Sequence, residues 1–149
     1  MIRSLLAGPA AGTGSDRTWG GIRTATTWGA AVGMISAACL ALTAGLVDLT
    51  AGGGDTPVLL MAGGLAGVVS SLLVARVNRP DRIRPSEVLS GATTALVSMV
   101  LCVAGLYLLT GAAGQPDDAL FEATSGVTTT ALSVLDPNSL GRGLLLVRA

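Results

Sequence analysis

The chain has 149 residues, of which 50% are hydrophobic and only 12% are charged. A soluble domain carries about 25% charged residues, so this composition argues against a water-soluble globular protein. The net charge is zero, which leaves no electrostatic case for binding nucleic acid. The chain has no histidine, and its two cysteines lie in apolar segments, so we expect no metal-ligand cluster.

Residues 1–27 are rich in glycine, threonine and serine and include three arginines. The apolar run in this segment is far shorter than the roughly 7–15 residues of a signal-peptide core. We therefore expect a polar cytoplasmic tail over 1–27 that leads into a helix.

Three long uncharged runs follow, over residues 28–47, 56–75 and 88–110. Each has about the 20 residues that an α-helix needs to cross a hydrocarbon core near 30 Å thick. The pattern predicts an all-α membrane protein in which 28–75 forms two amino-terminal transmembrane helices and a third helix begins at residue 88.

Glycines recur at four-residue spacing inside the runs, as Gly29 with Gly33 and Gly63 with Gly67. In a membrane helix such pairs let two backbones approach closely. A chain this rich in glycine and alanine also produces such pairs by chance, and the sequence leaves both interpretations open.

The segments between the runs predict the orientation. Residues 76–87 contain four arginines, whereas Asp48 and Asp55 are the charged residues between the first two runs. Arginine-rich loops stay in the cytoplasm. We therefore expect a multi-pass protein of the cell membrane with a cytoplasmic amino terminus, in which the chain lies outside after residue 110.

The segment 115–136, which follows the third run, is too short and too polar to span a membrane. Asp117 or Asp118 is a suitable helix N-cap, and 119–125 then makes about two helical turns. Gly126 predicts a break, followed by an extended stretch from Thr128 to Thr130.

A short helix with an extended threonine-rich stretch has a physical use inside a membrane. The carboxyl end of the helix favours a cation, and aligned backbone carbonyls replace the hydration shell of an ion. The alternative is an ordinary extracellular loop with helical character, and composition alone does not decide between the two.

The residues from Asp118 to Ser133 read Asp-Ala-Leu-Phe-Glu-Ala-Thr-Ser-Gly-Val-Thr-Thr-Thr-Ala-Leu-Ser. This stretch resembles the first pore loop of the Trk/Ktr/HKT superfamily of potassium transporters. Residues 84–111 are similar to the helix before that loop, and 139–148 to the start of the helix after it. The resemblance covers most of the chain, and its specificity lies in Asp118 to Ser133.

The resemblance implies a re-entrant pore helix and a filter-like loop. The superfamily surrounds its ion path with four such helix–loop–helix units. Residues 88–149 match the outer helix, the pore loop and the start of the second helix of one unit, so the chain is expected to be an amino-terminal fragment or component. The implied ion-filter residues are Val127, Thr128, Thr129, Thr130 and Ala131, and the implied pore-mouth or pore-helix residues are Asp117, Asp118 and Glu122. For Glu122, anchoring of the pore helix through hydrogen bonds stands beside contact with the ion as an alternative.

Ala131 departs from the family pattern, which has glycine there. An alanine at positive φ costs on the order of 1 kcal/mol or more. The resemblance also implies that Ala131 weakens selectivity for potassium over sodium, because plant members with serine at the first filter position are associated with sodium passage. Relaxed selection on a broken gene explains the same residue.

The function implied is monovalent cation uptake, with potassium or sodium as the transported ion and no cofactor. The implied partners are the lipid bilayer, a further pore-unit chain or copies of this one, and a cytosolic nucleotide-binding regulatory subunit. A membrane-embedded interaction module and a non-functional remnant are the alternatives. An enzyme is not expected, because outside the pore loop the runs carry no ionisable residue at mid-membrane depth.

Overall fold

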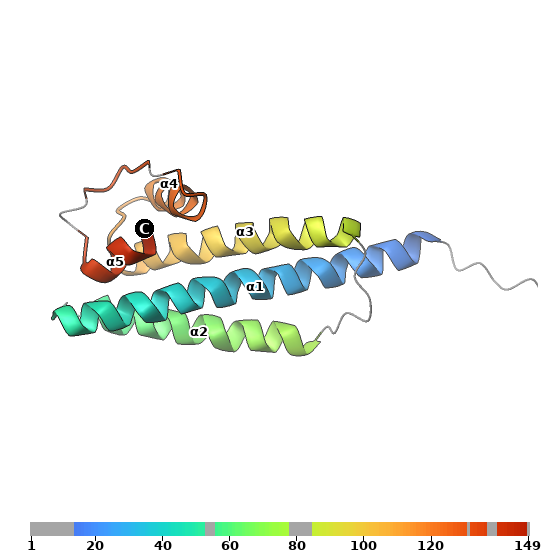
Figure 1. Cartoon of the computed structure of the whole chain (residues 1–149), viewed down its shortest axis with the longest axis horizontal. Helices are drawn as coiled ribbons and strands as arrows, with labels where there is room; N and C mark the ends of the chain where they lie inside the picture. Colours follow the sequence, from blue (N-terminus) through green and yellow to red (C-terminus); the bar gives the residue numbers. More distant parts are fainter. Residues whose placement is uncertain (1–13, 53–55, 78–84, 131, 137–139, 149) are drawn as a thin grey trace, which may run out of the picture.

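The computed structural model describes residues 14–52, 56–77, 85–130, 132–136 and 140–148. The described residues form five helices: α1 (Gly14–Ala51), α2 (Thr56–Val77), α3 (Pro85–Leu109), α4 (Pro116–Val127) and α5 (Arg142–Arg148). The fold is all-helical, as the sequence predicts, and Figure 1 shows α1, α2 and α3 running side by side.

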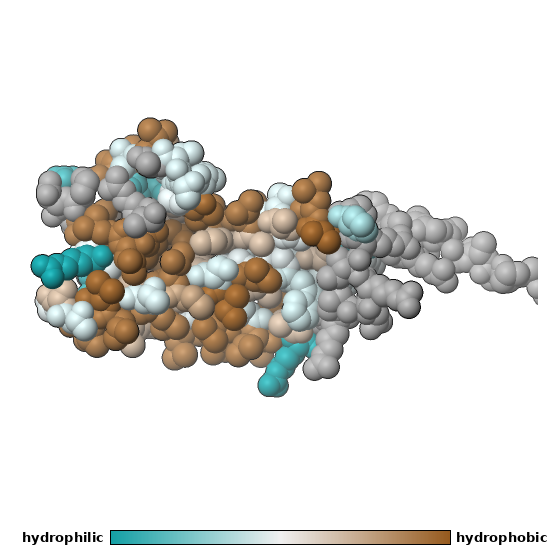
Figure 2. All heavy atoms as spheres, viewed as in Figure 1, coloured by the Kyte–Doolittle hydropathy of each residue, from teal (hydrophilic) through white to brown (hydrophobic). Residues whose placement is uncertain are grey.

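Three of the described helices are long and apolar enough to cross a membrane, with candidate spans over Gly20–Ala51, Pro57–Arg76 and Glu87–Leu109. Large apolar side chains cover the outer surface of these helices, and brown, hydrophobic atoms dominate the face drawn in Figure 2. Such a surface is unstable in water and suits a lipid environment. The helices therefore indicate a membrane-embedded protein.

The helix boundaries differ from the predicted ones mainly at α1, which begins at Gly14, 14 residues before the predicted run, so that part of the expected tail is helical. Once an apolar segment has nucleated a helix, extending it by a residue costs little. The expected loop 76–87 is also shorter, because Arg76 lies in the last turn of α2 and α3 begins at Pro85. Proline suits the first position of a helix, where its missing N–H has no intrahelical partner. Arg79, Arg82 and Arg84 lie outside the described residues.

Helix α1 lies between α2 and α3 and packs extensively against both, while α2 and α3 hardly contact each other. Small residues make this packing close. A Cβ atom on Gly29 or Gly33 would overlap the backbone of α3 at Gly91 or Ala95, and a Cβ on Gly67 would lie 3.0 Å from the Cβ of Ala38. The glycine spacing noted in the sequence therefore serves helix packing at these positions.

The two short helices lie together at the end of the bundle where α1 and α3 end (Figure 1). Helix α4 packs mainly on α3, and α5 packs mainly on α1. The core at this end joins buried side chains from all of these elements, among them Ala44, Leu60, Tyr107, Ala119 and Leu144. The two short helices are thus attached to two different long helices.

Candidate functional site

Helix α4 begins differently from the prediction. The N-cap is Gln115, which is extended and makes no side-chain capping bond, and Pro116 takes the first helical position. Asp117 and Asp118 lie in the first turn, where negative charge is favourable near the positive end of the helix dipole. The expected cap at Asp117 or Asp118 is therefore wrong by two or three residues, because proline is preferred at the position after the cap.

The carboxyl end of α4 also differs, since the helix continues through Gly126 to Val127. A glycine in a helix interior costs only about 1 kcal/mol relative to alanine, so it does not force a break. Val127 is helical, so the predicted break at Gly126 is wrong, while the implied filter role of Val127 stays a prediction.

The threonines form a turn that closes the helix. The backbone N–H groups of Thr128, Thr129 and Thr130 donate to the carbonyls of Thr124, Gly126 and Ser125, at 2.9, 3.1 and 3.0 Å. The expected extended stretch from Thr128 to Thr130 is therefore wrong at its start. These amides instead donate to carbonyls at the end of α4 that have no acceptor role within the helix itself. Ala131 lies outside the described residues, and the chain is non-helical over 132–136.

Thr129 has φ of 55° and is the residue other than glycine with positive φ among the described residues. This conformation is unfavourable for a β-branched side chain and is an outlier that points to a local constraint. The sequence pattern raises positive φ at Ala131 and gives no sign of it at Thr129.

Hydroxyl groups gather beside this turn. The hydroxyl of Thr128 donates to the Thr124 carbonyl at 2.6 Å and lies 3.4 Å from the hydroxyl of Thr130. The Thr130 hydroxyl donates to Ser125 Oγ at 3.1 Å, and Ser125 Oγ donates to the Leu132 carbonyl at 2.5 Å. The result is a chain of oxygen atoms that links the end of α4 to the segment after it.

Glu122 is buried on the inner face of α4, with 1% of its surface exposed. Its Oε1 accepts a hydrogen bond from Ser133 Oγ at 2.8 Å, and its Oε2 accepts one from the Val134 N–H at 3.2 Å. Hydrogen bonds are what makes a buried carboxylate tolerable. These contacts are of the anchoring kind, and they fold the segment after the turn back along α4. Asp117 is exposed and Asp118 half-buried, so Glu122 is the acidic residue of α4 that lies inside the structure.

Two further acidic residues are buried although they stand at the ends of apolar runs in the sequence. Asp48 lies in the last turn of α1 with 2% exposure, and Glu87 lies in the first turn of α3 with 6% exposure. The Glu87 side chain rests against Gly21 of α1, where a Cβ atom would overlap its Oε1. A glycine in the facing helix is the signal that could have indicated this burial.

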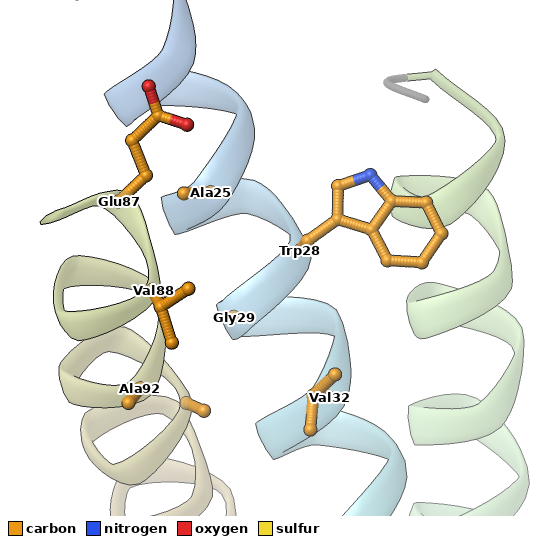
Figure 3. A pocket seen from close by; sticks show the side chains of 9 residues that line it. Ala25, Trp28, Gly29, Val32, Glu87, Val88 and Ala92 are labelled. Atoms are coloured by element: carbon orange, nitrogen blue, oxygen red, sulfur yellow. The ribbon is translucent and has the colours of Figure 1, made fainter. Parts of the chain in front are cut away.

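An apolar groove of about 480 Å³ runs between α1 and α3 below Glu87, lined by Ala25, Trp28, Gly29, Val32, Glu87, Val88, Gly91, Ala92 and Ala95. In Figure 3 the Trp28 ring points away from α3 and towards α2, while the Glu87 carboxylate lies beside α1. Apart from Glu87 and Trp28 the lining residues are apolar, so the groove offers few hydrogen-bonding groups to orient a polar ligand.

Fold and site together define a class. Within the described residues, this is a helical protein with three helices able to cross a membrane, and a short helix followed by a turn and a loop lies at one end of the bundle. Comparison with protein-family models, with curated proteins and with solved structures finds no match to this chain.

Proposed function

We propose that the chain contributes one pore loop to a transporter that takes up monovalent cations, with potassium as the expected ion, across a cell membrane. The observation that carries the proposal is the buried Glu122, which holds the segment after the threonine turn against α4. A helix of 12 residues is about 18 Å long, too short to cross a bilayer. A short helix with its following loop folded back is the arrangement that a pore loop requires.

The charge distribution of α4 supports attraction of a cation. Both acidic residues of its first turn, Asp117 and Asp118, raise the local concentration of cations at the mouth of a path. The last turn contains no basic residue, so the negative end of the helix dipole is not neutralised there. The hydroxyl and carbonyl oxygens of Thr128 to Thr130 lie at that end and are ligands of the kind that hard cations prefer.

Surface composition supports contact between this region and other apolar groups. Leu120, Phe121, Leu132 and Val134 are all more than 40% exposed, although they belong to no candidate span. Apolar side chains gathered on one polar segment mark a surface that is covered by protein or lipid. In the proposal, neighbouring pore units and the bilayer cover them.

A complete path needs three more loops of this kind. They come from further residues of the same polypeptide, from a second chain or from copies of this one, and a cytosolic nucleotide-binding subunit is the expected regulatory partner. The amino terminus and the arginine-rich segment 76–87 lie in the cytoplasm in this proposal, because positively charged loops are retained there.

The proposal is tested by ion flux. The chain is expressed in cells that lack potassium uptake, together with the polypeptide that supplies the remaining loops, and growth at limiting potassium and rubidium flux into vesicles are measured. Thr130→Val removes a hydroxyl at nearly constant volume and is expected to lower flux at least tenfold. Thr43→Val is the matched control, because Thr43 is exposed on α1 and its hydroxyl bonds only within its own helix, to Cys39 and Leu40. Flux that is absent with every partner, or equal in both variants, contradicts the proposal.

A second candidate is a membrane packing module without transport. The observation that favours it is the turn at Thr128 to Thr130, whose amides are bonded back to α4 where a filter would need an extended strand. This candidate predicts a stable complex with a membrane partner in detergent and no rubidium flux.

A further inference from the structure

Asp48 makes a hydrogen bond that joins distant parts of the chain. Its Oδ1 accepts the N–H of Gly143 at 2.6 Å, a contact between residues 95 positions apart. Its Oδ2 has no hydrogen-bond partner among the described residues. A carboxylate that is 2% exposed and makes one such bond is held by the surrounding fold at a cost in desolvation.

The bond falls at the beginning of α5. Gly143 is the second residue of that helix, and its N–H therefore has no intrahelical acceptor. The carboxylate of Asp48 supplies the acceptor from another helix, and its negative charge is favourable at the amino-terminal end. Asp48 thus caps α5 from α1.

Two glycines make the approach geometrically feasible. A Cβ atom on Gly143 would lie 2.9 Å from the Asp48 Cγ and would also overlap the carbonyl oxygen of Ala44. A Cβ on Gly141 would lie 3.1 Å from Oδ2. Both distances are shorter than an ordinary van der Waals contact. The absence of a side chain at Gly141 and Gly143 is therefore what lets the Asp48 carboxylate approach the backbone there.

We propose that Asp48 is a positioning residue for the loop between α4 and α5. Glu122 holds the near end of that loop to α4, which packs on α3, and Asp48 holds the far end to α1. The described residues on the two sides of the loop are thus attached to different long helices, Val134 through α4 to α3 and Gly143 to α1. What the loop does rests on the proposed function, whereas its attachment to α1 does not.

Hydrogen–deuterium exchange of the full chain in lipid nanodiscs tests this role. Asp48→Ala is expected to accelerate exchange about tenfold in α5 and in residues 132–136, since a hydrogen bond to a charged group is lost. Exchange in α2 and α3 is expected to stay within twofold of the unaltered chain. Asp117→Ala is the matched control, an exposed acidic residue whose loss leaves α5 unchanged.

Unchanged exchange in α5, or equal acceleration in every helix, overturns the proposal. If Asp48→Ala does not fold, Gly143→Ala separates the same two groups, and it must give the same local pattern.

In the assembled transporter, Asp48→Asn is expected to alter the ratio of rubidium to sodium flux, a quantity that general stability does not move. If the transporter conducts and the ratio of rubidium to sodium flux is unchanged, Asp48 only anchors α5, and its role in the loop is overturned. Absence of all flux contradicts the transport function, and exchange of residues 132–136 then decides the positioning role alone.

Discussion

Glu122 and Asp48 are both buried carboxylates that accept hydrogen bonds from the backbone, each from a different partner. Each has less than 3% of its surface exposed. Glu122 accepts the N–H of Val134, beyond the threonine turn, and Asp48 accepts the N–H of Gly143, 95 positions along the chain. Such bonds fix a segment more firmly than apolar contact alone, because losing either partner leaves a buried polar group unsatisfied. Glu122 therefore attaches Ser133 and Val134 to α4, and Asp48 attaches the beginning of α5 to α1.

Removing the Glu122 carboxylate is expected to release that segment. Glu122→Ala leaves the Ser133 hydroxyl and the Val134 N–H without this acceptor, and a hydrogen bond to a charged group contributes about 1.5–3 kcal/mol. A double-mutant cycle with Ser133→Ala, followed by denaturant unfolding in detergent, measures the coupling, which we expect to be about 1–2 kcal/mol. Additive effects of the two substitutions show that the hydrogen bond does not stabilise the fold.

Thr129 is the residue at which relief of strain is expected. A β-branched side chain at positive φ costs roughly 1–2 kcal/mol, whereas glycine adopts this conformation freely. After the larger chain entropy of glycine is subtracted, Thr129→Gly is expected to raise the free energy of unfolding by up to about 1 kcal/mol. Thr124→Gly is the control, because at this exposed helical position the substitution is expected to lower the free energy of unfolding by about 0.3–0.5 kcal/mol. A loss of stability in Thr129→Gly contradicts the strain.

At the scale of elements, close glycine contacts set how α1 meets α3. The backbones approach at Gly29 and Gly33, and Ser98 Oγ of α3 donates to the Ala30 carbonyl of α1 at 3.3 Å. In lipid no hydrophobic effect drives two apolar helices together, so close packing and such hydrogen bonds hold them.

A single methyl group is expected to separate these helices. Gly29→Ala places a Cβ on the Gly91 carbonyl and is expected to cost about 1–3 kcal/mol by overpacking. Gly105→Ala is the matched control, since a Cβ there meets no atom within 4 Å and alanine favours the helix by about 1 kcal/mol. Thermal unfolding in nanodiscs compares the two variants. Equal stability of the two means that the glycine contact is not required.

The elements most predictable from sequence are the helices that coincide with a long uncharged apolar run. Apolar length alone predicts α2 and α3 to within a few residues, because about 20 uncharged residues have few other stable arrangements. The start of α1 at Gly14 was not predictable in this way, since helix extension past the apolar run costs little and leaves no compositional mark.

The candidate site was less predictable, because its geometry depends on contacts between segments. Acidic residues and threonines were selected from the sequence, but the turn at Thr129 and the helical state of Val127 depend on hydrogen bonds back to α4. The partnership of Asp48 with Gly143 joins positions 95 apart, and local sequence patterns do not report such a separation.

For the whole molecule, the bundle has two chemically different ends. The beginning of α1, the end of α2 and the beginning of α3 lie at one end, and α4 and α5 lie at the other (Figure 1). Exposed Arg23 and Arg76 belong to the first end, and the sequence adds three arginines between α2 and α3. The second end carries Arg142 together with Asp117 and Asp118. This asymmetry favours retention of the first end in the cytoplasm.

Cysteine labelling in intact cells tests that orientation. After Cys39 and Cys102 are replaced by alanine, single cysteines are introduced by Gly20→Cys and Gln115→Cys, at exposed positions of the two ends. A membrane-impermeant maleimide is expected to label Gln115→Cys at once and Gly20→Cys only after the membrane is permeabilised. Both sites lie outside the arginine cluster, so neither substitution changes the charge that sets the topology. The reverse pattern would place α4 and its threonine turn in the cytoplasm, where Asp117 and Asp118 would face outgoing ions and an uptake role would lose its electrostatic support.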